Sequence, residues 1–139
     1  MPVRPHPYLR AYMAGITFPC FLLLFLMVGF TIARHVYHVP VPLERVIVFP
    51  MAVVPNAWGL WNALYVARHG RRRLSLGAHG AVLAFLLAPT AYTVTRLVGF
   101  EVPEPLARAF PFVLPAGVTA YYLIWKHVVG FLNELLGIA

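Results

Sequence analysis

Four long stretches of this 139-residue chain contain no aspartate, glutamate, lysine or arginine. They are bounded by Arg10 and Arg34, by Arg45 and Arg68, by Arg73 and Arg96, and by Arg108 and Lys126. A helix that crosses the hydrocarbon core of a bilayer, about 30 Å thick, needs about 20 apolar residues, with a range of about 17–25. All four stretches meet this length. The sequence therefore predicts four transmembrane helices, over about residues 11–33, 46–67, 74–95 and 106–126.

The composition supports this interpretation and excludes two other classes of protein. Hydrophobic residues make up 61% of the chain and charged residues only 11%, whereas a soluble domain carries about 25% charged residues. The same apolar content excludes a disordered chain. We therefore expect an all-α integral membrane protein, with residues 1–139 forming one compact bundle of four transmembrane helices. Residues 127–139 would extend the fourth helix or lie on the membrane as an interfacial tail.

The distribution of basic residues predicts how the helices are oriented. Seven of the 11 lysines and arginines lie at the two ends of the chain or in the connection between the second and third helices. By the positive-inside rule, these segments are cytoplasmic, so both termini are predicted to lie in the cytoplasm, with the helices in a bacterial inner membrane. That connection holds four arginines that we expect to bind anionic lipid headgroups. They are Arg68, Arg71, Arg72 and Arg73.

Small residues form a stripe on the second predicted helix. Asn56, Gly59 and Ala63 fall on one side of it, and small residues spaced by four let membrane helices approach closely. A similar ladder follows on the third predicted helix: Gly80, Ala84 and Ala88. Because the connection between these two helices is short, we expect them to pack against each other through these residues.

The neighbouring side of the second helix carries aromatic and polar residues. They are Trp58, Trp61, Asn62, Tyr65 and His69. Trp and Tyr near the ends of membrane helices commonly anchor them at the interface, which accounts for Tyr65. A polar group nearer the middle of the membrane, such as Asn62, usually faces the bundle interior or a cavity. Helix packing and anchoring are therefore the favoured interpretation of this side, and a binding site for a small molecule, made by these five residues, is the alternative.

The six histidines raise the question of a haem or metal site. The four candidates are His35, His38, His79 and His127. Two histidines at matching depth inside a helical bundle can ligate haem, while the i,i+3 spacing of His35 and His38 would suit a shared metal. No Cys, Asp or Glu stands near enough in the sequence to complete a metal-ligand set. We therefore expect no metal and no cofactor, with haem as a minor alternative.

Missing residue types narrow the possible functions. No predicted span contains Asp or Glu, which disfavours proton- or cation-coupled transport. Ser75 is the only serine and has no acidic residue near it, which disfavours a serine hydrolase. Basic residues in a membrane protein follow the topology rule and do not indicate nucleic acid. The sequence thus favours a non-enzymatic subunit that forms a homo-oligomer or joins a larger membrane complex. A small-molecule binder, channel or carrier and a haem- or quinone-binding redox subunit are the alternatives.

Overall fold

The structure, a computed structural model, describes residues 6–41, 43–47, 51–68, 74–97 and 104–138, and this part of the chain is helical without any strand. The elements are α1 (Pro7–His35), α2 (Leu43–Val46), α3 (Val53–Ala67), α4 (Leu76–Leu97), α5 (Glu104–Ile124), a π-helix η2 (Trp125–Val129) and α6 (Gly130–Leu135). Because α5, η2 and α6 follow one another without interruption, residues 127–135 continue the fourth predicted helix.

Three helical segments in the described part of the chain are long and apolar enough to cross a membrane. They are Pro7–His35, Leu76–Val94 and Arg108–Leu135. Most large apolar side chains on these segments are exposed, as on Phe25 of α1 and Phe112 of α5. Such a surface is suited to lipid and not to water. The structure is therefore consistent with an integral membrane protein, while its insertion and its orientation remain predictions.

The second predicted span, residues 46–67, forms a shorter helix than expected. The helix α2 ends at Val46, and α3 begins only at Val53. The 15 residues of α3 extend about 22 Å along the helix axis. Pro55 is the third residue of α3. A proline is tolerated there because the first four N–H groups of a helix have no intrahelical acceptor, whereas deeper in a helix it would remove a hydrogen bond. This proline favours the start of α3 just before it.

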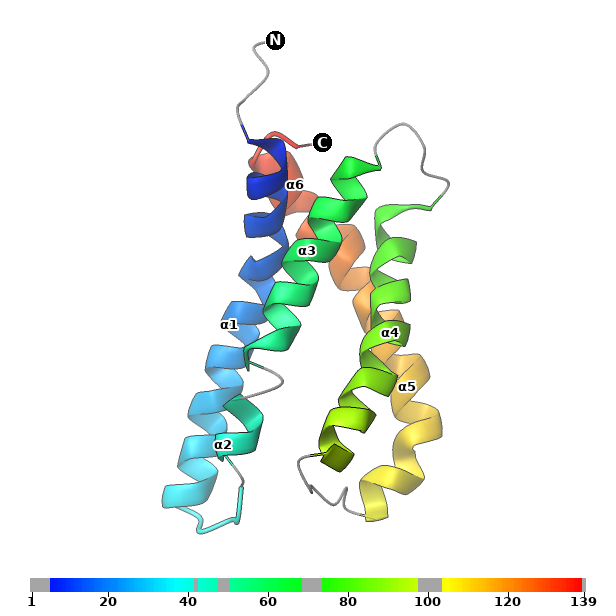
Figure 1. Cartoon of the computed structure of the whole chain (residues 1–139). Coiled ribbons are helices and arrows are strands. Elements are labelled where there is room, and N and C mark those ends of the chain that lie inside the picture. Colours follow the sequence, from blue (N-terminus) through cyan, green and yellow to red (C-terminus); the bar gives the residue numbers. More distant parts are fainter. Residues whose placement is uncertain (1–5, 42, 48–50, 69–73, 98–103, 139) are drawn as a thin grey trace.

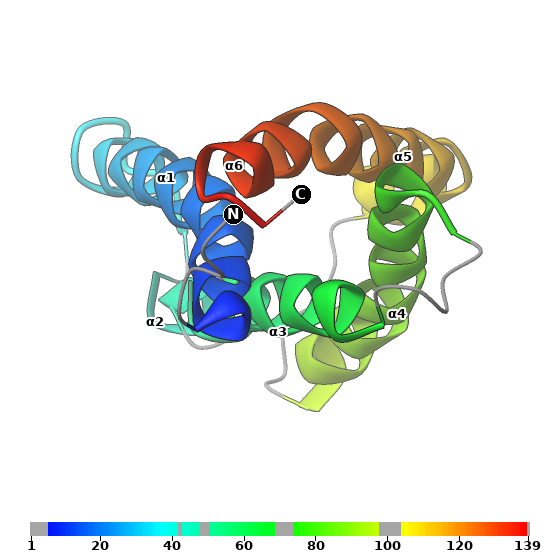
Figure 2. The same cartoon turned by 90° about the horizontal axis from the view of Figure 1, so that it is seen from above.

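The helices are arranged as two antiparallel pairs, α1 with α3 and α4 with α5 (Figure 1). The continuous α5–η2–α6 segment leads from α4 across to α1, so that the helices enclose a ring when seen from above (Figure 2). The start of α1 and the end of α6 lie at the same end of this bundle, and the two pairs diverge toward the other end (Figure 1). At that far end, an ion pair of 3.1 Å between Arg34 and Glu44 ties α2 to α1.

Glycines mark the closest approaches between helices. A Cβ added at Gly15 of α1 would lie 2.6 Å from the carbonyl oxygen of Trp58 and 2.8 Å from the Cα of Gly59 on α3. A Cβ added at Gly80 of α4 would lie 2.1 Å from Cγ of Trp125 on η2. Gly59 of the stripe on α3 therefore packs on α1 and Gly80 of the ladder on α4 packs on η2, whereas the sequence predicts that the two helices pack on each other through these residues.

The reason for this difference lies in the contact between α3 and α4. The ring of Trp61 from α3 stacks on the imidazole of His79 on α4, and the ring of Tyr65 lies tilted against the same imidazole. Ring centroids there are 4.7 and 5.1 Å apart, and the rings fill the space between the two helices. Bulky rings keep the two backbones apart, so close approach occurs where each helix instead presents glycine to another neighbour.

Candidate functional site

A pair of buried asparagines joins the middle of the chain to its C-terminal segment. Nδ2 of Asn62 on α3 donates to Oδ1 of Asn133 on α6 at 2.8 Å, and Nδ2 of Asn133 donates back to Oδ1 of Asn62 at 3.2 Å. Asn62 also donates to the carbonyl oxygen of Ala11 on α1 at 2.8 Å. Three helices thus meet at one amide, which is completely buried. Close by in the chain, Arg10 donates to the carbonyl oxygen of Leu136.

An aromatic cluster surrounds Trp58 in the centre of the bundle. The Trp58 ring lies 5.8 Å from Phe18, 4.9 Å from Tyr121 and 5.3 Å from Trp125, measured between ring centroids. Its Nε1 donates to the hydroxyl oxygen of Tyr121 at 3.3 Å. Trp58 and Trp125 are buried, together with Leu83, in the apolar core. The rings hold α1, α3, α5 and η2 together in one contiguous packing unit.

His79 joins α3 and α4 through hydrogen bonds as well as stacking. Nε1 of Trp61 donates to the carbonyl oxygen of His79 at 2.8 Å. Nε2 of His79 lies 3.0 Å from the carbonyl oxygen of Trp61, so the imidazole donates there in the tautomer that carries its proton on Nε2. The His79 side chain is buried. In this reciprocal pair each side chain bonds to the backbone carbonyl of the other residue, so the ring nitrogens Nε1 of Trp61 and Nε2 of His79 both have a partner.

The structure brings together four of the five residues predicted to bind a small molecule. Trp58, Trp61, Asn62 and Tyr65 all face the bundle interior from α3, and His69 lies outside the described residues. The polar atoms of Trp58, Trp61 and Asn62 bond to neighbouring helices. A ligand at this side would have to compete with those hydrogen bonds. The arrangement therefore favours helix packing, which is also the interpretation that the sequence favours for this side.

The predicted helix-packing residues have different surroundings. Gly59 lies against Tyr12 and Ile16 of α1, and Gly80 lies against Trp125. Asn56 is exposed, accepts a hydrogen bond from the Tyr12 hydroxyl and donates to the carbonyl oxygen of Ala52, four residues earlier. The others are small residues at varied depth: Ala63 and Ala88 are half-buried and Ala84 is buried.

The candidate metal ligands and the described headgroup arginine do not gather at one place. His35, His38 and His127 are exposed, and only His79 is buried. The described residues contain no group of three histidine, cysteine or acidic side chains placed to hold a metal. Of the arginines expected at lipid headgroups, Arg68 is exposed at the end of α3. Residues 71–73 lie outside the described part of the chain.

Sequence reasoning missed the contribution of Trp125 and Asn133. Both are buried; Trp125 lies near the end of the fourth predicted span, and Asn133 follows that span. On a regular α-helix, eight residues would turn Asn133 about 80° away from Trp125. The π-helix at Trp125–Val129 takes up one extra residue, which brings the two back to within about 20° on the same side. Neither the π-helix nor its effect on the buried side follows from the sequence pattern.

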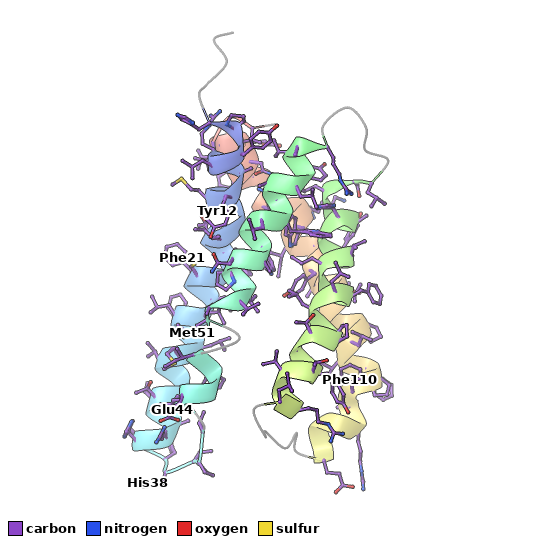
Figure 3. The ribbon with its side chains drawn as sticks, viewed as in Figure 1. Tyr12, Phe21, His38, Glu44, Met51 and Phe110 are labelled. Carbon is purple, nitrogen blue, oxygen red and sulfur yellow. The ribbon has the colours of Figure 1, made fainter. Side chains whose placement is uncertain are left out.

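A narrow groove lies between α4 and α5, which we call the α4–α5 groove. Its walls are Ala84, Leu87, Ala88 and Ala91 of α4, residues of α5 between Phe110 and Tyr121, and Val54 of α3. Its volume is about 260 Å³. Phe110, at one end of the groove, lies toward the end of the bundle opposite the termini (Figure 3). A Cβ added at Gly117 in the wall would meet no atom within 4 Å, so the groove is open there.

No protein-family model, no curated protein and no solved structure matches this chain. Its function therefore has to follow from the geometry described above.

Proposed function

We propose that this chain is a non-enzymatic subunit of a membrane assembly and that it self-associates through the outer half of α1. The observation that carries the proposal is an apolar stripe on that helix that no other described segment covers. Five large side chains make up the stripe: Phe21, Leu24, Phe25, Val28 and Ile32.

The buried polar groups of the bundle support a structural role for its interior. The amides of Asn62 and Asn133 pair with each other, Trp61 pairs with His79, and the indole of Trp58 donates to a tyrosine. Buried polar groups that are paired in this way hold helices in register. Catalysis requires polar groups that can reach a substrate, and these groups already bind neighbouring helices.

The outer half of α1 extends beyond the part that packs in the bundle. All buried residues of α1 lie between Ala11 and Pro19. Beyond Pro19, the stripe residues recur at i, i+3, i+4 and i+7, and so they share one side of the helix. Each is between 46% and 73% exposed, and Phe21 points outward from α1 (Figure 3). This side is available to another membrane helix.

A second copy of the chain is the partner that fits this stripe. Helix association in lipid depends on van der Waals packing and close approach, because lipid tails are as apolar as the side chains themselves. The aromatic rings of Phe21 and Phe25 offer large contact areas, and Gly29, one turn beyond Phe25, has no atom within 4 Å of an added Cβ. A two-fold interface would place the same stripe on both sides and bring equivalent residues together.

Oxidative cross-linking tests this proposal in native membranes. The only cysteine, Cys20, is exposed, and Cys20→Ser provides a background without thiols. A single cysteine is then introduced as V28C in the stripe or as F112C on α5, where the side chain is even more exposed. We expect V28C to form a disulfide-linked dimer at low protein density and F112C to remain monomeric. Equal cross-linking of both, or of neither, would overturn self-association through α1.

A pair of glycines provides a matched control for this experiment. Gly29→Leu adds bulk to the stripe side of α1, and Gly117→Leu adds the same bulk to α5, and neither added side chain starts against another atom. We expect Gly29→Leu to suppress the V28C dimer and Gly117→Leu to leave it unchanged. If both substitutions suppress it, general destabilisation explains the loss and the stripe does not.

A further inference from the structure

We infer that the exposed side of the η2–α6 segment, residues 125–135, forms a second contact between copies of this chain, in which Lys126 of one copy pairs with Glu134 of the other. The contact lies on a different helix from the α1 stripe and does not depend on it. It follows from the charges on this segment, from their spacing and from the inclination of the segment in the bundle.

Two opposite charges lie exposed on a segment that is apolar enough to cross a membrane. Among the described residues, Arg108–Leu135 is one of three such segments, and it carries Lys126 and Glu134, both exposed. In the part of the chain that the structure describes, neither side chain takes part in an ion pair. Charged side chains at membrane depth are costly and usually pair with one another. A second chain that supplies the opposite charge to each would meet this requirement.

The π-helix places the two charges on the same side of the segment. They are eight residues apart, and on a regular α-helix this spacing would turn them about 80° from each other. The extra residue taken up at Trp125–Val129 reduces the difference to about 20°. Phe131 lies between them along the axis and is also exposed. The exposed surface of the segment therefore carries an aromatic ring between a positive and a negative charge.

This arrangement is complementary to itself when two copies run in opposite directions. A two-fold axis near Gly130, the midpoint between the two charges, sets Lys126 of each copy opposite Glu134 of the other. Both ion pairs then form in one contact, with the Phe131 rings of the two copies near its centre. Two charges of the same sign at these positions would repel the second copy instead.

The inclination of the segment allows this contact inside a membrane. Trp125 packs on Trp58, and Asn133 bonds to Asn62, four residues further along α3. Eight residues of the segment, about 12 Å long, thus rise by only about 6 Å along α3, and the segment runs obliquely along one side of the ring of helices (Figure 2). Two such segments related by an axis along the membrane normal run in opposite directions in the membrane plane. The flexible lysine side chain covers the remaining difference in height.

Charge reversal in the full-length chain tests the inference. Association is measured in liposomes by energy transfer between donor- and acceptor-labelled copies, and all chains carry Gly29→Leu so that the α1 stripe does not contribute. We expect Lys126→Glu alone and Glu134→Lys alone each to weaken association at least about tenfold, because each sets like charges opposite one another. The control Glu104→Lys reverses another exposed acid, on α5, and should leave association unchanged.

A mixture of the two single variants separates a lost contact from a lost fold. The Lys126→Glu copy carries two acids at these positions and the Glu134→Lys copy carries two bases, so both ion pairs form again in the mixed dimer. We expect the mixture to associate within about threefold of the chain without charge reversal, which misfolded copies could not do. Three results would each overturn the inference: no association without charge reversal, single variants that associate as strongly as that chain, or a mixture no stronger than the single variants.

Discussion

Asn62 on α3 and Asn133 on α6 exchange two amide hydrogen bonds, at 2.8 and 3.2 Å, although 71 residues separate them in the chain. Each amide supplies a donor and an acceptor, so the pair satisfies itself within an apolar interior. The further bond from Asn62 to the carbonyl of Ala11 brings α1 into the same contact. The C-terminal segment is thereby fixed against the first and third helices.

Replacing one asparagine of this pair should cost more than replacing both. Asn62→Leu leaves the buried amide of Asn133 without its partner, and we expect a loss of about 1–3 kcal/mol in the free energy of unfolding. The double variant Asn62→Leu, Asn133→Leu removes both polar groups and should lose less than the sum of the single substitutions. Unfolding in detergent, monitored through the loss of helical signal, measures the free energy of unfolding of the single and the double variants. Asn56→Leu is the comparison: it removes hydrogen bonds with Tyr12 and Ala52 at an exposed position and leaves no buried amide behind, so it should cost less than Asn62→Leu.

Adding one methyl group to α1 should destabilise the fold at Gly15 and not at Gly29. A Cβ at Gly15 would press on backbone atoms of Trp58 and Gly59, which cannot rotate away, while a Cβ at Gly29 meets nothing within 4 Å. We expect Gly15→Ala to cost about 1–3 kcal/mol through overpacking. Gly29→Ala should be neutral or slightly stabilising, since alanine favours a helix. Similar melting temperatures for the two variants would contradict the α1–α3 crossing.

The two most buried tryptophans should respond differently to phenylalanine. Nε1 of Trp58 donates to Tyr121, whereas Nε1 of Trp125 is buried without a partner in the described structure. Both substitutions remove ring volume, but only Trp58→Phe also removes a hydrogen bond. We expect Trp58→Phe to cost about 0.5–1.5 kcal/mol more than Trp125→Phe. Chemical unfolding of both variants in the same detergent tests this, and a larger loss for Trp125→Phe would contradict it.

Reporter fusions test the orientation predicted from the basic residues. The start of α1, the end of α3, the start of α4 and the end of α6 lie at one end of the bundle (Figure 1). Fusions after Ala139 and at Gly70 should therefore report the same compartment, which the positive-inside rule predicts to be the cytoplasm. A fusion at Glu101 should report the opposite side. A periplasmic signal at Gly70 would reverse the predicted orientation.

The sequence by itself determined the helical class and the apolar surface of this protein. Stretches without charged residues force the backbone into helices, because lipid offers no partner for an unpaired N–H or C=O group. That requirement is local, and so the positions of α1, α4 and α5 could be predicted from residue order. The clustering of Trp58, Trp61 and Asn62 on one side of a helix also follows from its period of 3.6 residues.

Only the tertiary structure decided what each helix side faces. A stripe of small residues allows close approach by any neighbouring helix. The sequence therefore does not specify that Gly59 packs against α1 and Gly80 against Trp125. A buried asparagine such as Asn62 is suited by its residue type to bind a ligand. In the structure it bonds to Asn133, which follows the π-helix at Trp125–Val129, and this π-helix shifts the register of the segment that carries Asn133. Packing partners and grooves depend on contacts between distant segments, and local residue patterns do not specify those contacts.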